Sequence, residues 1–240
     1  MEELPSFLDL FGIDMHQKFW GLPLHDWLPV IMSVIVALIL VLLSLVLTRN
    51  LRRIPTSSQA FLEMVVERLE TFVKGLIGPE GVIFLPFIGS LFIYILLMNL
   101  FGIIPLMHSA TDKLSVTLGL ALVVFFCTHY VGIKGQGAWG YLRHLIGEPW
   151  WLFPIMFPVH LIGEIARPIS LSLRLFGNIT GEHTVTVIFI GLSPVILGFI
   201  PLPVQLPMVL LGILFSFIQA LIFATLAGIY IAGAIGATEH

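Results

Sequence analysis

The sequence predicts an all-α membrane protein, a single integral membrane domain of 240 residues with five transmembrane helices and one interfacial amphipathic helix. Of its residues, 58% are hydrophobic and only 10% are charged, and the mean hydropathy is +1.05. A water-soluble domain carries about 25% charged residues, so a soluble globular protein is excluded. The apolar excess also excludes a disordered chain, and the single cysteine, Cys127, excludes a module held together by disulfides.

The N-terminal segment, residues 1–26, is predicted to lie outside the membrane. It carries five acidic side chains against one lysine, Lys18. A secretory signal instead begins with basic residues and ends in a small-residue cleavage site, so this segment is not interpreted as one. The apolar run that follows, residues 27–48, is uncharged until Arg49. About 20 apolar residues cross a bilayer as a helix, so we predict the first span here.

Residues 57–77 predict an amphipathic helix. Its apolar residues recur at three- and four-residue spacing, and five charged residues lie between them. This segment is too charged to cross the bilayer and is suited to lying on the membrane interface. The alternative is a small helix that packs on a neighbouring element.

Four more apolar runs complete the predicted spans. Residues 83–107 end at a polar turn that contains Asp112 and Lys113, and residues 114–133 end at Lys134. The last two runs, residues 157–192 and 204–236, are the longest.

The basic residues predict the orientation of these five spans, which place the two termini on opposite sides. With the N-terminus outside, seven basic residues lie in inner loops and two in outer loops. The positive-inside rule therefore predicts an outer N-terminus and a cytoplasmic C-terminus. The inner residues are Arg49, Arg52, Arg53, Arg68, Lys74, Lys134 and Arg143, and the outer ones are Lys18 and Lys113.

The fourth predicted span contains charges, which cost roughly 2.5–3.5 kcal/mol or more at mid-bilayer and usually mark an ion pathway. At about 100° per residue, six of its residues fall within about 40° of one line along the helix. Glu164 and Glu182 flank this polar line on opposite sides, about 80° away. The six residues are His160, Arg167, Ser170, Arg174, Asn178 and Gly181.

Arg174 divides this polar line into an outer and an inner part. Arginine stays protonated in proteins, so Arg174 cannot relay a proton, but it can keep a carboxylate ionised and block proton passage. Glutamate and histidine can exchange protons once burial or neighbours shift them. Glu182 and His183 lie ~12–13 Å away toward the outside, and His160 and Glu164 lie ~15–21 Å away toward the inside. We therefore predict two aqueous access routes separated by a barrier.

A structural interpretation competes for the inner residues. Glu164 and Arg167 are three residues apart and can form an ion pair near the inner interface, and His160 can extend to that interface.

Arg174 has no acidic partner in the other predicted spans. Their polar residues at a similar level are neutral, so we expect the counter-charge on another protein. The chain has no GxGxxG, Walker, HExxH or GxSxG motif, its histidines lack metal-ligand spacing, and its basic residues are too few for nucleic-acid binding. The neutral residues are Asn99, Ser216, Gln219, Thr225 and Tyr230.

The stretch Ser170-Leu-Ser-Leu-Arg174-Leu-Phe-Gly-Asn178, with Gly181-Glu182 and the later Ile218-Gln219-Ala-Leu-Ile-Phe223, resembles subunit a of the bacterial F-type ATP synthase. The resemblance implies a multi-pass protein of the bacterial inner membrane whose last two helices are long and tilted. It implies a stator with two half-channels beside a rotating c-subunit ring. The expected partners are this ring, the b-subunit peripheral stalk and the rest of the complex, with membrane lipid around them. It implies no catalytic site of its own, no cofactor and no metal.

The resemblance also implies site residues. Arg174 would face the ring carboxylate, release it for protonation and prevent leakage between the half-channels. Asn178, Glu182 and Gln219 would match polar residues of the proton pathway, and Ser170 and Asn99 match further polar positions. With the titratable residues above, the predicted pathway comprises Glu182, His183, Asn178, Gln219, Ser170, Asn99, Glu164 and His160.

Two positions depart from some members of that family. Those members have a histidine seven residues before the glutamine, where this chain has Gly212, and His183 beside Glu182 is the candidate replacement. They also have an acidic residue three positions after the asparagine of the second span, where this chain has Gly102.

Three other functions stay open at the level of sequence. A sodium-coupled version of the same subunit differs mainly in ring residues. A self-contained ion transporter typically shows repeated halves, which this chain lacks. An intramembrane enzyme needs a nucleophile and a base at compatible depth, and no such pair is evident.

Overall fold

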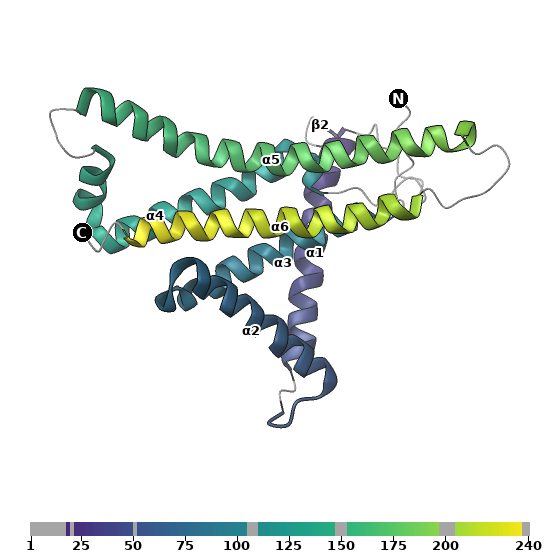
Figure 1. Cartoon of the computed structure of the whole chain (residues 1–240), viewed down its shortest axis with the longest axis horizontal. Helices are drawn as coiled ribbons and strands as arrows, with labels where there is room; N and C mark the ends of the chain where they lie inside the picture. Colours follow the sequence, from purple (N-terminus) through teal and green to yellow (C-terminus); the bar gives the residue numbers. More distant parts are fainter. Residues whose placement is uncertain are drawn as a thin grey trace. The chain divides into compact units, whose positions relative to one another are not determined.

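The computed structural model describes residues 18–19, 22–49, 52–104, 110–146, 153–196 and 205–236, and every long element in these ranges is a helix (Figure 1). The elements in chain order are β1 (Lys18–Phe19), β2 (Leu22–Pro23), α1 (Leu24–Thr48), α2 (Ser57–Ile77), the 3₁₀ helix η2 (Pro79–Phe84), α3 (Leu85–Phe101), the 3₁₀ turn η3 (Ala110–Asp112), α4 (Leu114–Ile146), α5 (Phe153–Ile196) and α6 (Gln205–Gly236).

Four helical stretches among the described residues are long and apolar enough to cross a membrane. They correspond to four of the five predicted spans. The remaining one, the fourth predicted span, lies within α5, a helix of 44 residues. That α5 crosses the membrane, and that the last two helices are tilted, stay predictions. The four stretches are Trp27–Thr48, Pro79–Phe101, Leu114–Gly135 and Val209–Ile235.

One predicted boundary needs correction, and one predicted span belongs to a longer helix. The helix predicted to reach residue 107 ends at Phe101, where three successive i→i+3 backbone bonds tighten the chain. These bonds begin at Gly102, a residue that weakens a helix, and Pro105 follows in the sequence. The span predicted over residues 114–133 agrees with the apolar stretch Leu114–Gly135, and its helix continues to Ile146 as α4, with a kink at Gly137, whose φ of 72° suits glycine.

The all-α class predicted from the sequence is confirmed, and a small hairpin precedes α1. Lys18 pairs with Pro23 and Phe19 with Leu22 in an antiparallel ladder of two-residue strands. A ladder this short has no alternating apolar pattern that a sequence can reveal. Residues 1–17 lie outside the described residues.

The chain divides into two compact units. Boundaries between them fall inside the helices α3, α4, α5 and α6. Unit 1 comprises Met1–Leu51, Ile93–Val116 and Leu175–Leu221. Unit 2 comprises Arg52–Phe92, Thr117–Arg174 and Ile222–His240. Each unit therefore contains one stretch of α5 and one stretch of α6.

The core of unit 1 forms around α1 and α3. Val36 on α1 and Ile95 and Met98 on α3 are almost completely buried. The Tyr94 hydroxyl donates a hydrogen bond of 2.9 Å to the carbonyl of Ser33. Most other large side chains of α1 are exposed, as expected of a helix whose surroundings are lipid rather than protein.

The core of unit 2 forms where α2, α3 and α6 meet. Val73, Ile88, Ala224 and Ile231 make its buried cluster. The predicted amphipathic helix is confirmed as α2 with the predicted ends, and its C-terminal half supplies Val73 to this core. The C-terminal half of α2 therefore packs on neighbouring elements, as the alternative interpretation expected. Apolar side chains of its N-terminal half, such as Phe61, are exposed.

Candidate functional site

The polar line predicted on α5 lies on the exposed side of the helix. All six of its residues are exposed, whereas Leu171, Leu175 and Ile179 on another face are buried. In a protein surrounded by lipid, apolar side chains can face outward at no cost, but exposed charged and amide groups cannot. As a predicted membrane span, α5 would need water or a polar partner on this face.

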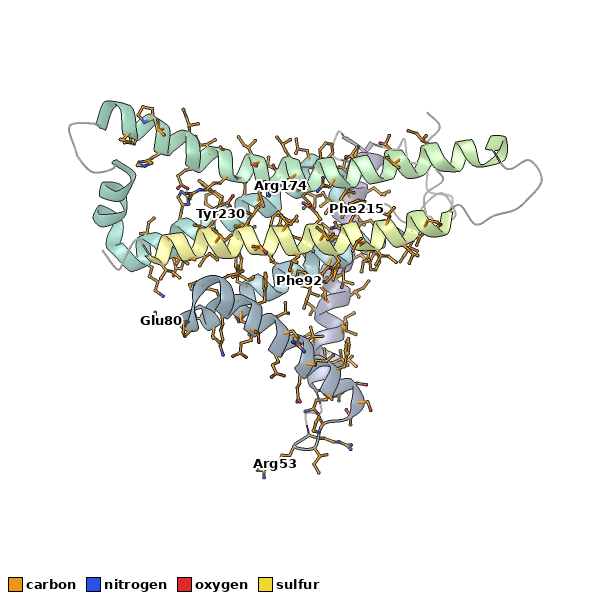
Figure 2. The ribbon with its side chains drawn as sticks, in the orientation of Figure 1. Arg53, Glu80, Phe92, Arg174, Phe215 and Tyr230 are labelled. Atoms are coloured by element: carbon orange, nitrogen blue, oxygen red, sulfur yellow. The ribbon has the colours of Figure 1, made fainter. Side chains whose placement is uncertain are left out.

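Arg174 lies at the middle of α5 (Figure 2). Its side chain is exposed, and it forms no hydrogen bond or ion pair with any other side chain that the structure describes. A guanidinium offers five donors and stays charged. The prediction that its counter-charge lies outside this chain is consistent with this geometry.

Asn178, one turn after Arg174, contacts α6. Its Nδ2 donates a hydrogen bond of 2.6 Å to Oε1 of Gln219. Gln219 is only 2% exposed, while Asn178 itself is exposed. The structure therefore brings together two predicted site residues that lie 41 positions apart.

Asn99 anchors a second polar group in the same unit. The Thr111 hydroxyl donates a 2.8 Å hydrogen bond to Asn99 Oδ1, and Asn99 Nδ2 donates a longer one, 3.5 Å, to the carbonyl of Ser216. Asn99 and Thr111 are buried. Ser216 precedes Gln219 by three residues on α6, so the two polar groups are adjacent along this helix.

Asp112 is a residue of this region that the sequence did not predict. Sequence reasoning used it only to mark a polar turn between two spans. In the structure, its Oδ1 accepts a hydrogen bond of 3.3 Å from the hydroxyl of Thr180 on α5. The contact spans 68 residues, and no local pattern could have revealed it.

Glu164 and Arg167 form the ion pair that the structural interpretation predicted. Glu164 Oε1 lies 2.6 Å from Arg167 Nη1, and the Glu164 side chain is 17% exposed against 44% for Arg167. The Arg167 guanidinium also lies over the Tyr230 ring of α6, 5.2 Å from its centroid. The Glu164 carboxylate and the Tyr230 ring thus both stabilise the positive charge of Arg167.

His129 on α4 is a second residue that the sequence did not predict. Its Nε2 lies 3.9 Å from Glu164 Oε2, and its Nδ1 lies 3.0 Å from the carbonyl of Phe125. A cavity of about 10 Å³ adjoins this group, roughly the room that one water molecule needs. Its polar lining residues are Thr128, His129, Glu164, Arg167 and Tyr230.

The remaining predicted residues also lie on α5. Ser170 and His160 are exposed. Glu182 and His183 belong to the helix, eight and nine residues after Arg174, and their side chains lie outside the described part of the structure. Among the described residues, no group of three or more histidine, cysteine, aspartate or glutamate side chains is placed to hold a metal ion.

The polar, exposed face of α5 is unusual in an otherwise apolar membrane protein. Comparison with known proteins identifies the family to which the chain belongs. Residues 30–232 match the family described as ATP synthase A chain. The chain belongs to the ATP synthase A chain family. The resemblance predicted from the sequence is therefore confirmed, and the chain is a multi-pass membrane protein of a family concerned with ATP synthesis and ion transport.

Three relatives, each named ATP synthase subunit a, illustrate how much of the family the chain shares. It is 37% identical over 238 residues to the protein of Protochlamydia amoebophila, covering 95% of this chain and 88% of the relative. It is 45% identical over 200 residues to that of Trichlorobacter lovleyi, covering 83% and 84%. It is 43% identical over 211 residues to that of Geobacter sulfurreducens, covering 88% and 86%. Members of the ATP synthase A chain family are membrane-sector subunits without a catalytic site of their own.

Proposed function

We propose that this chain is the proton-conducting stator subunit of an F-type ATP synthase, with two half-channels that lead to and from the carboxylates of a c-subunit ring. Proton flow through them would drive ring rotation and thereby ATP synthesis. The observation that carries the proposal is the exposed Arg174, which has no partner among the described side chains and lies on a polar face of a helix in a member of this family.

Arg174 would face the ring and act through its fixed charge. A ring carboxylate that reaches it becomes ionised, since a nearby cation favours the charged form. The proton leaves into one half-channel, and a second proton enters from the other after the ring has moved. Because arginine does not deprotonate, protons cannot pass directly from one half-channel to the other.

The outer half-channel would include Asn178, Gln219 and Asn99, with Glu182 and His183 as its titratable groups. The hydrogen bond between Asn178 and Gln219 supports this assignment, because Asn178 follows Arg174 by one turn of α5 and the bond joins it to a second neutral amide. Neutral amides can orient water without competing with the ring carboxylate for the arginine.

The inner half-channel would use Glu164, His160 and Ser170. The support is a group of polar side chains on three helices, in which Glu164 lies near both Arg167 and His129 beside a water-sized cavity. Arg167 in an ion pair keeps its charge compensated, so Arg174 stays the one cation proposed to face the ring.

The orientation and partners follow from the same proposal. The N-terminus would lie outside and the C-terminus in the cytoplasm of a bacterial inner membrane, as the basic residues predict. The c ring would cover the exposed face of α5, and the b-subunit peripheral stalk would hold the chain against rotation. A sodium-coupled subunit is the second candidate, because the ion is selected mainly by ring residues.

The test replaces Arg174 in the assembled synthase, reconstituted in sealed vesicles. We expect Arg174→Ala to abolish both ATP-driven proton pumping and ATP synthesis driven by an imposed proton gradient. Arg68→Ala, which removes an exposed charge on α2, is the matched control and should keep both activities. Coupled transport at the normal rate in the Arg174→Ala complex would overturn the proposal. Pumping that requires sodium ions in the wild-type complex would favour the sodium-coupled form.

A further inference from the structure

The hydroxyl group of Ser216 on α6 is buried without a partner. The residue is 0% exposed, and its Oγ has no hydrogen-bond partner in the part of the chain that the structure describes. A serine inside a helix usually bonds to a carbonyl of the preceding turn, as Ser172 does with the carbonyl of Ile169 at 3.0 Å. Buried polar groups in native proteins are nearly always satisfied by protein or by ordered water.

Two polar pairs lie next to Ser216 within the same unit. On one side, Asn99 donates to the Ser216 carbonyl and accepts from Thr111. On the other, Gln219, one turn along α6, accepts from Asn178 of α5. At 3.5 Å, the Asn99 contact is at the limit of a direct hydrogen bond and is therefore weak.

We propose that the Ser216 hydroxyl binds a water molecule that joins the Asn99–Thr111 pair to the Gln219–Asn178 pair and forms a step of the outer half-channel. This inference rests on the proposed function and adds a residue and a water site to it. A hydroxyl suits this role because it offers one donor and two acceptor positions, and it can reorient between two neighbours.

The transfer step needs no further titratable residue in this group. A proton that arrives at the water forms one new O–H bond and gives a hydronium ion. Breaking another O–H bond of that ion passes a proton to the next oxygen and leaves neutral water. The amides of Asn99 and Gln219 hold the water in place and do not change their own protonation state.

Substitution of Ser216 distinguishes a structural role of its hydroxyl from a water-binding role, because stability and proton conduction respond differently. Removing a buried hydroxyl that has no protein partner costs little stability, since no protein donor or acceptor is left unpaired. A fall in proton conduction without a fall in stability therefore identifies a role in transfer.

The experiment compares Ser216→Ala with Ser216→Thr and with Ser172→Ala, in the assembled complex in sealed vesicles. Ser172 is a buried serine bonded to its own helix, so it controls for loss of a buried hydroxyl. We expect Ser216→Ala to lower ATP-driven proton pumping about tenfold, the effect of one hydrogen bond lost from a transfer barrier. Its thermal unfolding midpoint should not fall, Ser216→Thr should keep most of the pumping, and Ser172→Ala should pump like the wild type.

Wild-type pumping by Ser216→Ala would overturn the inference, and so would equal losses in Ser216→Ala and Ser216→Thr. If Ser216→Ala fails to assemble, Ser216→Cys replaces it, because its thiol has a similar size but bonds water weakly. Wild-type pumping by that variant would also overturn the inference. Arg174→Ala in the same vesicles separates the two proposals: if it abolishes coupling while Ser216→Ala has no effect, only the water site is wrong.

Discussion

Asn178 Nδ2 lies 2.6 Å from Gln219 Oε1, and this hydrogen bond ties α5 to α6 one turn beyond Arg174. Both side chains are neutral amides, so the contact fixes the two helices without adding a charge that would neutralise the arginine. Gln219 is buried and Asn178 is exposed, which places the pair at the edge of the helix contact rather than within it. The contact therefore links the packing of α5 on α6 to the exposed face of α5 that is proposed to meet the ring.

This bond predicts that Asn178 and Gln219 act as a pair. Asn178→Ala and Gln219→Ala should each lower the thermal stability of the complex, and the double variant should lose less than the sum. Contacting residues typically show interaction energies of about 0.5–3 kcal/mol in such a cycle. Thermal unfolding of the four complexes measures it. Combining Asn178→Ala with Thr71→Ala, whose hydroxyl bonds only its own helix, should give additive effects. Additivity for the Asn178 and Gln219 changes as well would contradict the contact.

Apolar runs and helical spacing predicted most of the helices, because a segment that crosses or lies on a membrane is recognised from its local composition. The amphipathic spacing over residues 57–77 gave α2 with both ends correct, and the apolar run over residues 204–236 gave α6 to within one residue. The end of α3 was wrong, because uncharged residues after Gly102 continue the apolar run while the backbone already turns. Composition detects what lipid tolerates and does not detect where a helix ends.

The line of polar residues on α5 was predictable from the sequence, whereas contacts between residues far apart in the chain were not. Arg174 was singled out because a charge within an apolar helix needs a compensating group. Glu164 and Arg167, three residues apart, were also predictable as an ion pair. By contrast, the contact between Asp112 and Thr180 depends on how distant segments meet. Those positions follow from tertiary packing, which leaves no periodic trace in the sequence.

The stacking of Arg167 on Tyr230 predicts that the ring, rather than its hydroxyl, matters for stability. Tyr230→Phe should leave the thermal stability of the complex close to that of the wild type. Tyr230→Leu should lower it by about 0.5–2 kcal/mol, because the guanidinium loses the aromatic face 5.2 Å away. Tyr130→Leu, on an exposed tyrosine of α4, is the control for losing an aromatic side chain. Equal losses in Tyr230→Phe and Tyr230→Leu would show that the hydroxyl is the stabilising group instead.

Two glycines of α6 predict opposite responses to the same substitution. A Cβ at Gly228 would lie 2.8 Å from Leu76 Cδ1 of α2, so Gly228→Ala forces that side chain to move. Overpacking of this kind typically costs about 1–3 kcal/mol. A Cβ at Gly233 meets no atom within 4 Å, and Gly233→Ala should raise stability by up to about 1 kcal/mol through helix propensity alone.

The clash at Gly228 also predicts its own rescue, which thermal unfolding of the assembled complex can measure. Leu76→Val removes the terminal methyl groups that Gly228→Ala would meet. The cost of Gly228→Ala should therefore be smaller in the Leu76→Val background than in the wild type. Gly233→Ala should have the same effect in both backgrounds, because its site is open. An unchanged cost of Gly228→Ala in the Leu76→Val background would mean that α2 and α6 do not pack through this pair.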